Sequence, residues 1–171
     1  PCPAIVQVYG GPGARTVRRA RQGVRTQLWA RAGYVLFRLD NRGMGNRGRA
    51  FAAAAAGAPV TDWSRYDTHY AERYLDRPQA NPEGYARAAV FAQLEAGYGT
   101  PLLLMHGMAD DNVTFDHSTR LYDALQAEGR VFEMMTWPGQ RHGIRTPPRR
   151  MHRARTVSAV FARHLDGPTL P

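Results

Sequence analysis

Residues 101–112 read Pro-Leu-Leu-Leu-Met-His-Gly-Met-Ala-Asp-Asp-Asn, an apolar run that passes directly into a polar turn. The apolar half lacks strict alternation, which is typical of a strand buried on both faces of a parallel sheet. The polar half lies beyond the carboxyl end of this strand, which is the place where ligands bind in parallel sheets. This segment therefore predicts an α/β fold class and indicates where a functional site would lie.

Strands and helices are predicted to alternate along the rest of the chain. The strands are expected over residues 5–8, 34–37 and 131–137, and the helices over 16–32, 117–128 and 149–165. Val17, Leu28 and Trp29 are the candidates for the inner face of the first helix. The five consecutive alanines at 52–56 are interpreted as a helical turn. The alternation favours a mostly parallel sheet covered by helices.

The composition limits the classes of function. A chain of 171 residues with 43% hydrophobic residues can form one domain with its own core, and no apolar run is long enough to predict a membrane span. The single cysteine, Cys2, excludes an intramolecular disulfide and a cysteine-based zinc site. His69, His106, His117, His152 and His164 show no metal-ligand spacing and are interpreted as structural residues, so we expect neither metal nor cofactor.

The formal charge of +9 raises the question of nucleic acid, but all 23 basic residues are arginine, as expected of a GC-rich genome. The densest cluster contains Arg15, Arg18, Arg19, Arg21 and Arg25. We interpret it as the solvated face of a helix and expect no nucleic-acid or membrane partner. A basic interaction domain stays open as a distant alternative.

Two side chains at predicted strand ends have the residue types of a catalytic pair. Asp110 follows the strand at 101–105, and His142 follows the strand at 131–137. This chain order matches the last two members of an α/β-hydrolase triad, in which a carboxylate orients the imidazole that moves the proton. Taken alone, a pair of solvated surface residues is the better explanation of an Asp and a His 32 residues apart.

Six blocks of sequence carry a more specific signal. They are residues 7–12, 39–43, 57–63, 66–74, 106–113 and 138–143, with the sequences Gln-Val-Tyr-Gly-Gly-Pro, Leu-Asp-Asn-Arg-Gly, Gly-Ala-Pro-Val-Thr-Asp-Trp, Tyr-Asp-Thr-His-Tyr-Ala-Glu-Arg-Tyr, His-Gly-Met-Ala-Asp-Asp-Asn-Val and Pro-Gly-Gln-Arg-His-Gly. Together they resemble the catalytic domain of the dipeptidyl peptidase IV family, within the prolyl oligopeptidase clan of serine peptidases. The resemblance implies an α/β-hydrolase fold, with Asp110 as triad acid, His142 as triad base and the Tyr9 hydroxyl as an oxyanion donor.

The resemblance also implies a pocket for a proline ring, formed by Val60, Trp63, Tyr66, Tyr70 and Val113. Asn112 matches a residue whose amide holds a substrate carbonyl. Aromatic walls suit a rigid saturated ring. Tyr66 and Tyr70 lie four residues apart and would share one face of a helix, where they could equally form an aromatic core stripe. The implied substrate is a peptide with proline at its second position.

The nucleophile of this family has no counterpart here. The three serines, Ser64, Ser118 and Ser158, all lie outside any Gly-x-Ser-x-Gly elbow. In the family, this elbow lies between the two blocks that match residues 39–43 and 57–63. In the present sequence, the residues between these blocks are too few to form a strand, an elbow and a crossover helix. We therefore predict that residues 1–171 are a partial C-terminal peptidase domain with an internal gap near 51–56 and an incomplete hydrolase sheet. An unrecorded segment, a deletion and a degenerate relative are all open explanations.

The propeller domain that precedes the catalytic domain in this family is absent from the sequence. The resulting hypothesis is a fragment of a serine exopeptidase that releases N-terminal Xaa-Pro dipeptides. The alternative is a non-catalytic relative that binds peptides or partners through the same pocket. The resemblance is compatible with a homodimer and with a periplasmic or extracellular location, and the sequence leaves a cytoplasmic one open.

Overall fold

The computed structural model describes residues 3–7, 17, 23–38, 53–94 and 100–165. Its contacts divide the chain into two units, one made of residues 1–54 and 146–171 and the other of residues 55–145. The strands form two sheets, and the pairs β1–β2 and β4–β5 are parallel. The predicted α/β class is confirmed.

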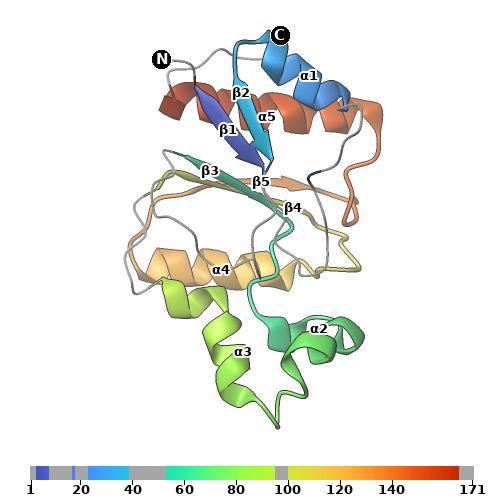
Figure 1. Cartoon of the computed structure of the whole chain (residues 1–171), viewed down its shortest axis with the longest axis vertical. Helices are drawn as coiled ribbons and strands as arrows, with labels where there is room; N and C mark the ends of the chain where they lie inside the picture. The colour runs from blue at the N-terminus through green and yellow to red at the C-terminus, as the bar shows by residue number, and fades with distance from the viewer. Residues whose placement is uncertain (1–2, 8–16, 18–22, 39–52, 95–99, 166–171) are drawn as a thin grey trace. The chain divides into compact units, whose positions relative to one another are not determined.

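The first unit contains a parallel strand pair with its crossover helix (Figure 1). Strand β1 (Ala4–Gln7) pairs with β2 (Val35–Arg38), and helix α1 (Val24–Arg31) lies between them in sequence. Trp29 and Tyr34 are each only 4% exposed. Gly33 follows the helix with a φ of 94°, a conformation that glycine adopts without steric cost and that turns the chain into β2.

Helix α1 is shorter than the 16–32 expected from sequence. It begins after Gly23, whose extended backbone (φ −63°, ψ 157°) caps the helix. Val17 is 51% exposed and non-helical, so its predicted place on the inner face is wrong. The hydrophobic stripe was weak upstream of Gly23, and a glycine costs about 1 kcal/mol inside a helix.

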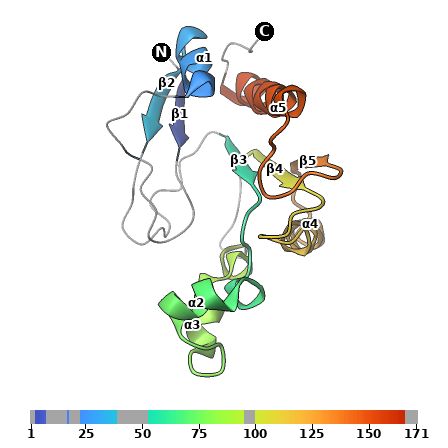
Figure 2. The ribbon, with the colours of Figure 1, turned by 90° about the vertical axis from the view of Figure 1, so that its right-hand side faces the viewer.

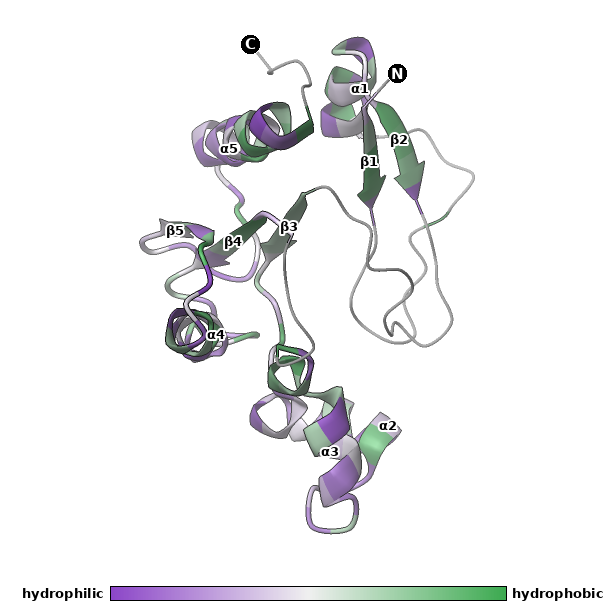
Figure 3. Cartoon of the chain, turned by 90° about the vertical axis from the view of Figure 1, so that its left-hand side faces the viewer, coloured by the Kyte–Doolittle hydropathy of each residue, from purple (hydrophilic) through white to green (hydrophobic). Residues whose placement is uncertain are grey.

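Helix α5 (Pro147–Leu165) is the long amphipathic helix of the first unit, and it confirms the helix predicted over 149–165. Its buried residues are Ala154, Val157, Ser158, Val160 and Phe161. Figure 3 shows its alternation of hydrophobic and hydrophilic faces. Among the described helices, none combines the length and apolar character that crossing a bilayer requires.

The second unit has a three-stranded sheet in the order β3 (Ala54–Gly57), β4 (Leu102–Gly107) and β5 (Glu133–Trp137). The central strand confirms the prediction for 101–105, and its position between two neighbours explains why Leu103, Leu104 and Met105 are all buried. Helix α4 (Asp116–Ala127) covers one face of this sheet (Figure 2). Leu104 packs there in one core cluster with three helix residues, namely Leu121, Tyr122 and Leu125.

The alanine run forms a strand, so its interpretation as a helical turn is wrong. Residues Ala54–Gly57 constitute β3, and the Ala58 N–H donates to the Met105 carbonyl at 2.7 Å just beyond the pairing. Hydrogen bonding to β4 outweighs the helix preference of alanine, because tertiary context overrides local propensity. Strand β5 likewise begins at Glu133 instead of 131, since Val131 is 94% exposed.

Short helices connect β3 to β4. They are η2 (Trp63–Arg65), α2 (Thr68–Leu75), α3 (Pro82–Ala88) and η3 (Val90–Gln93). Each of the first three begins at a polar cap: Asp62, Asp67 and Asn81 accept hydrogen bonds from backbone N–H groups of the following turn. Such caps supply the acceptors that the first turn of a helix lacks.

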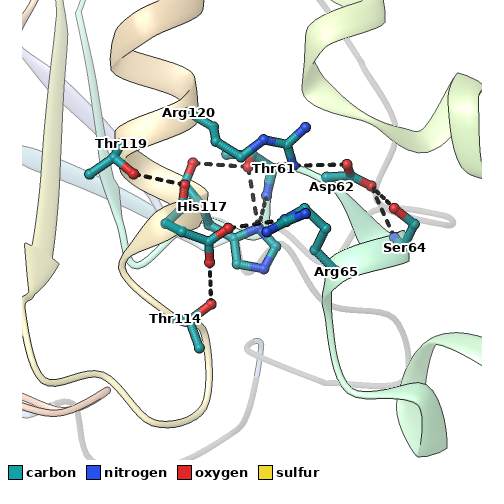
Figure 4. A network of polar contacts seen from close by, with 9 residues as sticks. Thr61, Asp62, Ser64, Arg65, Thr114, His117, Thr119 and Arg120 are labelled. Atoms are coloured by element: carbon teal, nitrogen blue, oxygen red, sulfur yellow. Dashed lines mark hydrogen bonds and ion pairs between the residues drawn. The ribbon is translucent and has the colours of Figure 1, made fainter.

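A buried pair attaches the start of this helical segment to α4 (Figure 4). Thr61 and His117 are both fully buried. The Thr61 backbone N–H donates to His117 Nδ1 at 3.3 Å, and the Thr61 hydroxyl donates to the His117 carbonyl at 3.0 Å. Nδ1 therefore accepts, so the neutral ring carries its hydrogen on Nε2, which has no hydrogen-bond partner among the described residues.

Two ion pairs surround this buried contact, as Figure 4 shows. Arg65 Nε lies 3.0 Å from Asp116 Oδ2, and Arg120 Nη1 lies 3.1 Å from Asp62 Oδ2. Arg65, Asp116 and Arg120 are 51%, 39% and 42% exposed, whereas Asp62 is 17% exposed. Solvent-exposed pairs of this kind contribute about 0–1 kcal/mol each. The buried Thr61–His117 contact is therefore the main polar constraint on the position of η2.

We expect Leu104→Ala to destabilise the chain by about 2–5 kcal/mol, because it leaves a cavity between β4 and α4. Met134→Ala on the adjacent strand is the matched control, since Met134 is 59% exposed against 1% for Leu104. The control should change stability by about 0.5 kcal/mol or less. Urea denaturation measures both, and equal effects would contradict the described core.

We expect His117 to make stability depend on pH. Burial lowers the pKa of His117 below its ordinary 6.5, an effect that Asp116 opposes. The unfolded chain therefore binds this proton more readily, so the stabilisation is complete above pH 6.5 and is lost as pH falls through the folded-state pKa. The urea concentration at the midpoint of unfolding should therefore fall as the pH is lowered from about 8 to about 5. His117→Gln should weaken the dependence of the urea midpoint on pH, whereas His69→Gln, the exposed control, should leave it unchanged. If the parent protein and both variants show the same dependence on pH, the role of His117 is refuted.

Candidate active site

Asp110 lies in a tight turn just beyond the carboxyl end of β4. Its backbone N–H donates to the Gly107 carbonyl at 3.1 Å. Its Oδ1 accepts from the backbone N–H groups of Asn112 at 2.9 Å and Val113 at 3.1 Å. The Asp110 side chain is fully buried. A buried carboxylate with two backbone donors on one oxygen is fixed in orientation and directs its second oxygen elsewhere.

That second oxygen meets His142. His142 Nδ1 lies 2.9 Å from Asp110 Oδ2, and the His142 side chain is 47% exposed. Because Nδ1 faces a carboxylate, it carries the hydrogen of the neutral ring and leaves Nε2 as a proton acceptor. The structure therefore brings together the two side chains that the strand-end rule selected.

The approach of the two loops depends on a glycine at the end of β4. Gly107 is opposite Trp137 in the parallel register, and the Ala109 N–H donates to the Gln140 carbonyl at 3.0 Å. A Cβ on Gly107 would collide with the Gln140 carbonyl oxygen and lie 2.6 Å from that of Arg141. Only glycine permits this approach of the His142 loop to the Asp110 turn.

A second histidine contacts Asp110, and the sequence analysis treated it as purely structural. His106, in β4, has its Nε2 3.1 Å from Asp110 Oδ2 and 2.9 Å from the Val113 carbonyl oxygen. Its side chain is fully buried. The available signal was a polar residue within an otherwise apolar central strand, because buried polar groups require partners.

Three aromatic residues of the predicted proline pocket gather in the η2–α2 segment. The Trp63 and Tyr70 rings stack with centroids 6.0 Å apart, and Tyr66 contacts both edge-on at 5.6 and 5.8 Å. Tyr66 precedes helix α2, so the expectation that Tyr66 and Tyr70 share one helix face is wrong. The turn between η2 and α2 brings the rings together instead.

One hydrogen bond joins this aromatic cluster to the Asp110 turn. The Tyr66 hydroxyl donates to Asn112 Oδ1 at 2.8 Å. The amide oxygen of Asn112 is thereby used, which orients the NH₂ group as the remaining donor of this exposed side chain. Asp110 and the aromatic rings therefore belong to one local arrangement.

The remaining predicted residues have different outcomes. Val113 is 2% exposed and Val60 is partly buried, but neither has a described contact with the aromatic rings. Tyr9 lies outside the described residues, as do residues 51–52 of the gap predicted near 51–56. Asp111 and Arg141 form an exposed ion pair at 2.6 Å.

The serines of the chain are placed in other environments. The Ser64 hydroxyl donates to Asp62 Oδ1 at 2.6 Å, and Ser118 Oγ lies 2.6 Å from His106 Nδ1. Ser118 and Ser158 are essentially fully buried, at 0% and 1% exposure. A nucleophile must reach both a base and a substrate, and burial prevents this for these two.

Arginines crowd together in the first unit. Partial burial lowers the pKa of Arg25, and the nearby charges of Arg38 and Arg150 lower it further. Burial lowers the pKa of Arg153 as well, and the nearby charge of Arg25 lowers it further. The described part of this unit contains no Asp or Glu. Across the described residues, no group of three or more His, Cys, Asp or Glu could hold a metal ion.

Comparisons with known proteins agree with this geometry. Dipeptidyl peptidase 8 of Mus musculus and of Homo sapiens are each 30% identical over 208 residues, which covers 85% of this chain and 23% of the relative. A "probable dipeptidyl-aminopeptidase B" of Neurospora crassa is 41% identical over 117 residues, covering 68% and 12%. The chain thus spans a quarter or less of the length of these curated relatives.

A solved structure shows the fold. The crystal structure of a "putative dipeptidyl aminopeptidase IV" from Bacteroides ovatus superposes with a TM-score of 0.83 at 24% identity, covering 96% of this chain and 31% of the other. The chain accordingly has a partial α/β-hydrolase fold. The family model of the prolyl oligopeptidase family matches residues 44–168, nearly three quarters of the sequence. The chain belongs to the prolyl oligopeptidase family of serine peptidases.

Proposed function

We propose that the protein carrying this chain is a serine exopeptidase that releases N-terminal Xaa-Pro dipeptides from peptides. The observation that carries the proposal is a single turn that serves two purposes. Asp110 in this turn binds His142 at 2.9 Å, and Asn112, two residues later, binds Tyr66 of the aromatic cluster at 2.8 Å. An acid–base pair thus lies beside aromatic rings suited to a rigid saturated ring.

The proton chemistry follows from the arrangement of the pair. His142 Nε2 takes the proton of a serine hydroxyl as that oxygen attacks the peptide carbonyl. The buried Asp110 carboxylate stabilises the imidazolium that forms, and His142 then returns the proton to the leaving amine. Water, activated in the same way, hydrolyses the resulting acyl-enzyme.

The aromatic cluster supplies the preference for proline. Trp63, Tyr66 and Tyr70 offer ring faces and edges, which pack well against a pyrrolidine ring that has no N–H to satisfy. The Asn112 NH₂ group donates to a substrate carbonyl. Val60 and Val113 complete the apolar lining in this proposal, and Tyr9 supplies the oxyanion donor.

In this proposal, the nucleophilic serine is not one of the 171 residues. It lies in a further segment of the full protein, which would be inserted near residues 51–56 of this sequence. Alignment length supports a gap inside the matched region. The alignment with dipeptidyl peptidase 8 extends over 208 residues while covering 85% of a 171-residue chain, so the relative has inserted residues inside the matched region.

A second candidate is a non-catalytic relative that binds peptides through the same pocket. The placement of the serines favours it, because Ser118 is fully buried and the Ser64 hydroxyl is bonded to Asp62. A fluorophosphonate probe separates the two candidates, since only an activated serine reacts with it.

The native protein should have a mass well above 19.1 kDa and should cleave a Gly-Pro chromogenic substrate. His142→Ala should lower kcat by about 10⁴- to 10⁶-fold, because it removes the base. Arg141→Ala is the matched neighbour and should stay close to the parent rate, since it breaks only an exposed ion pair. The probe should label a serine other than Ser64, Ser118 and Ser158. Intact His142→Ala activity or a native mass of 19.1 kDa without labelling would refute the enzyme proposal.

Tyr66→Ala should impair proline substrates more than alanine substrates, because it removes one ring of the cluster and the bond that orients Asn112. Tyr66→Phe keeps the ring and removes only the bond. It should retain the proline preference while raising KM for both substrates. Ratios of kcat/KM for Gly-Pro and Gly-Ala substrates measure this, and an unchanged ratio in Tyr66→Ala would remove Tyr66 from the pocket.

A further inference from the structure

The Asp110 carboxylate has more donors than a catalytic dyad needs. Oδ1 accepts two backbone N–H groups, and Oδ2 is approached by His142 Nδ1 at 2.9 Å and by His106 Nε2 at 3.1 Å. A carboxylate offers about four lone-pair directions, so this set fills them. His106 competes with His142 for the same oxygen, and a role limited to core packing does not account for that placement.

The hydrogen of His106 can be placed from its neighbours. Nε2 faces two acceptors, Asp110 Oδ2 and the Val113 carbonyl oxygen at 2.9 Å, so Nε2 carries a hydrogen. Nδ1 lies 2.6 Å from Ser118 Oγ, a hydroxyl that can donate to it. The side chains of His106 and Ser118 are both buried, so their partners are these protein groups.

We propose that His106 is a neutral Nε2–H imidazole, kept so by the Ser118 hydroxyl, and that it positions the Asp110 carboxylate for His142. The inference rests on the proposed function, in which Asp110 is the triad acid. A cationic His106 would neutralise Asp110 and weaken its stabilisation of the His142 imidazolium. A neutral donor instead holds Oδ2 in place and leaves the negative charge available.

Ser118, His106 and Asp110 have the residue types of a catalytic triad, but they cannot act as one. Ser118 and His106 are at most 2% exposed, so no substrate reaches the hydroxyl. Instead, the three side chains form a buried chain of polar contacts that holds the Asp110 carboxylate in place. His106 also packs edge-on against Phe115 with ring centroids 5.5 Å apart, which fixes the plane of the imidazole.

Nuclear magnetic resonance of the ¹⁵N-histidine-labelled chain tests both halves of the proposal. At neutral pH the His106 spectrum should show a hydrogen on Nε2 and none on Nδ1. His142 should show a low-field Nδ1–H resonance from its bond to Asp110. A doubly protonated His106, or one protonated on Nδ1 alone, would overturn the tautomer assignment.

Three substitutions separate positioning from packing. His106→Phe keeps an aromatic ring but removes the donor, and the His142 low-field resonance should be lost. His106→Gln restores an N–H near the position of Nε2 and should recover the resonance. His117→Gln is the control, because His117 is equally buried but bonds to Thr61, and it should leave the resonance unchanged.

Circular dichroism shows whether each variant is folded. If His106→Phe does not fold, Ser118→Ala provides the same test, because it releases Nδ1 while retaining the imidazole; the His142 resonance should then broaden or disappear. A sharp, unshifted resonance in a folded His106→Phe or Ser118→Ala chain would overturn the positioning role. These readouts need no nucleophile, so they stand apart from the probe and turnover experiments that test the peptidase.

Discussion

Burial of one carboxylate governs the second unit. Removing Asp110 from water carries a large desolvation cost, which the protein offsets only by surrounding the group with donors. Two of these come from the backbone of its own turn, one from the central strand and one from the loop after β5. Each of those segments must be in place for the charge to be tolerated. The arrangement thus links the end of β4, the turn that follows it and the loop after β5 into one polar centre.

The pocket side of the site is linked to that centre by a hydrogen bond. Tyr66 reaches it through Asn112, while Thr61 attaches the preceding residues to α4 through His117. The ion pairs nearby are exposed and contribute little to stability. The buried Thr61–His117 contact and the packing of the rings on one another both help to fix the aromatic cluster.

Much of this could be predicted from sequence where chemistry and position coincide. The strand at 101–105 and the polar turns at Asp110 and His142 were recognisable because a buried parallel strand has a distinct pattern and its carboxyl end is a preferred site. The alanine run was misjudged, because alanine favours a helix and only its pairing with β4 makes it a strand. His106 was underestimated, because its partner Asp110 is set by the conformation of a turn that the sequence pattern does not show. The position of Tyr66 outside α2 has the same origin, since a four-residue spacing implies a shared face only within a continuous helix.

The turn from Asp110 to Val113 assigns four consecutive residues to four directions: a buried acid, an exposed ion pair, an amide beside the aromatic rings and a buried apolar side chain. Consecutive residues cannot be shifted individually along a backbone. An insertion or deletion of one residue would exchange all four environments at once, whereas a substitution alters a single one. Variation in such a turn can therefore accumulate by replacement but not by change of length, and a lineage that alters its substrate preference here would do so while preserving the spacing between acid and amide.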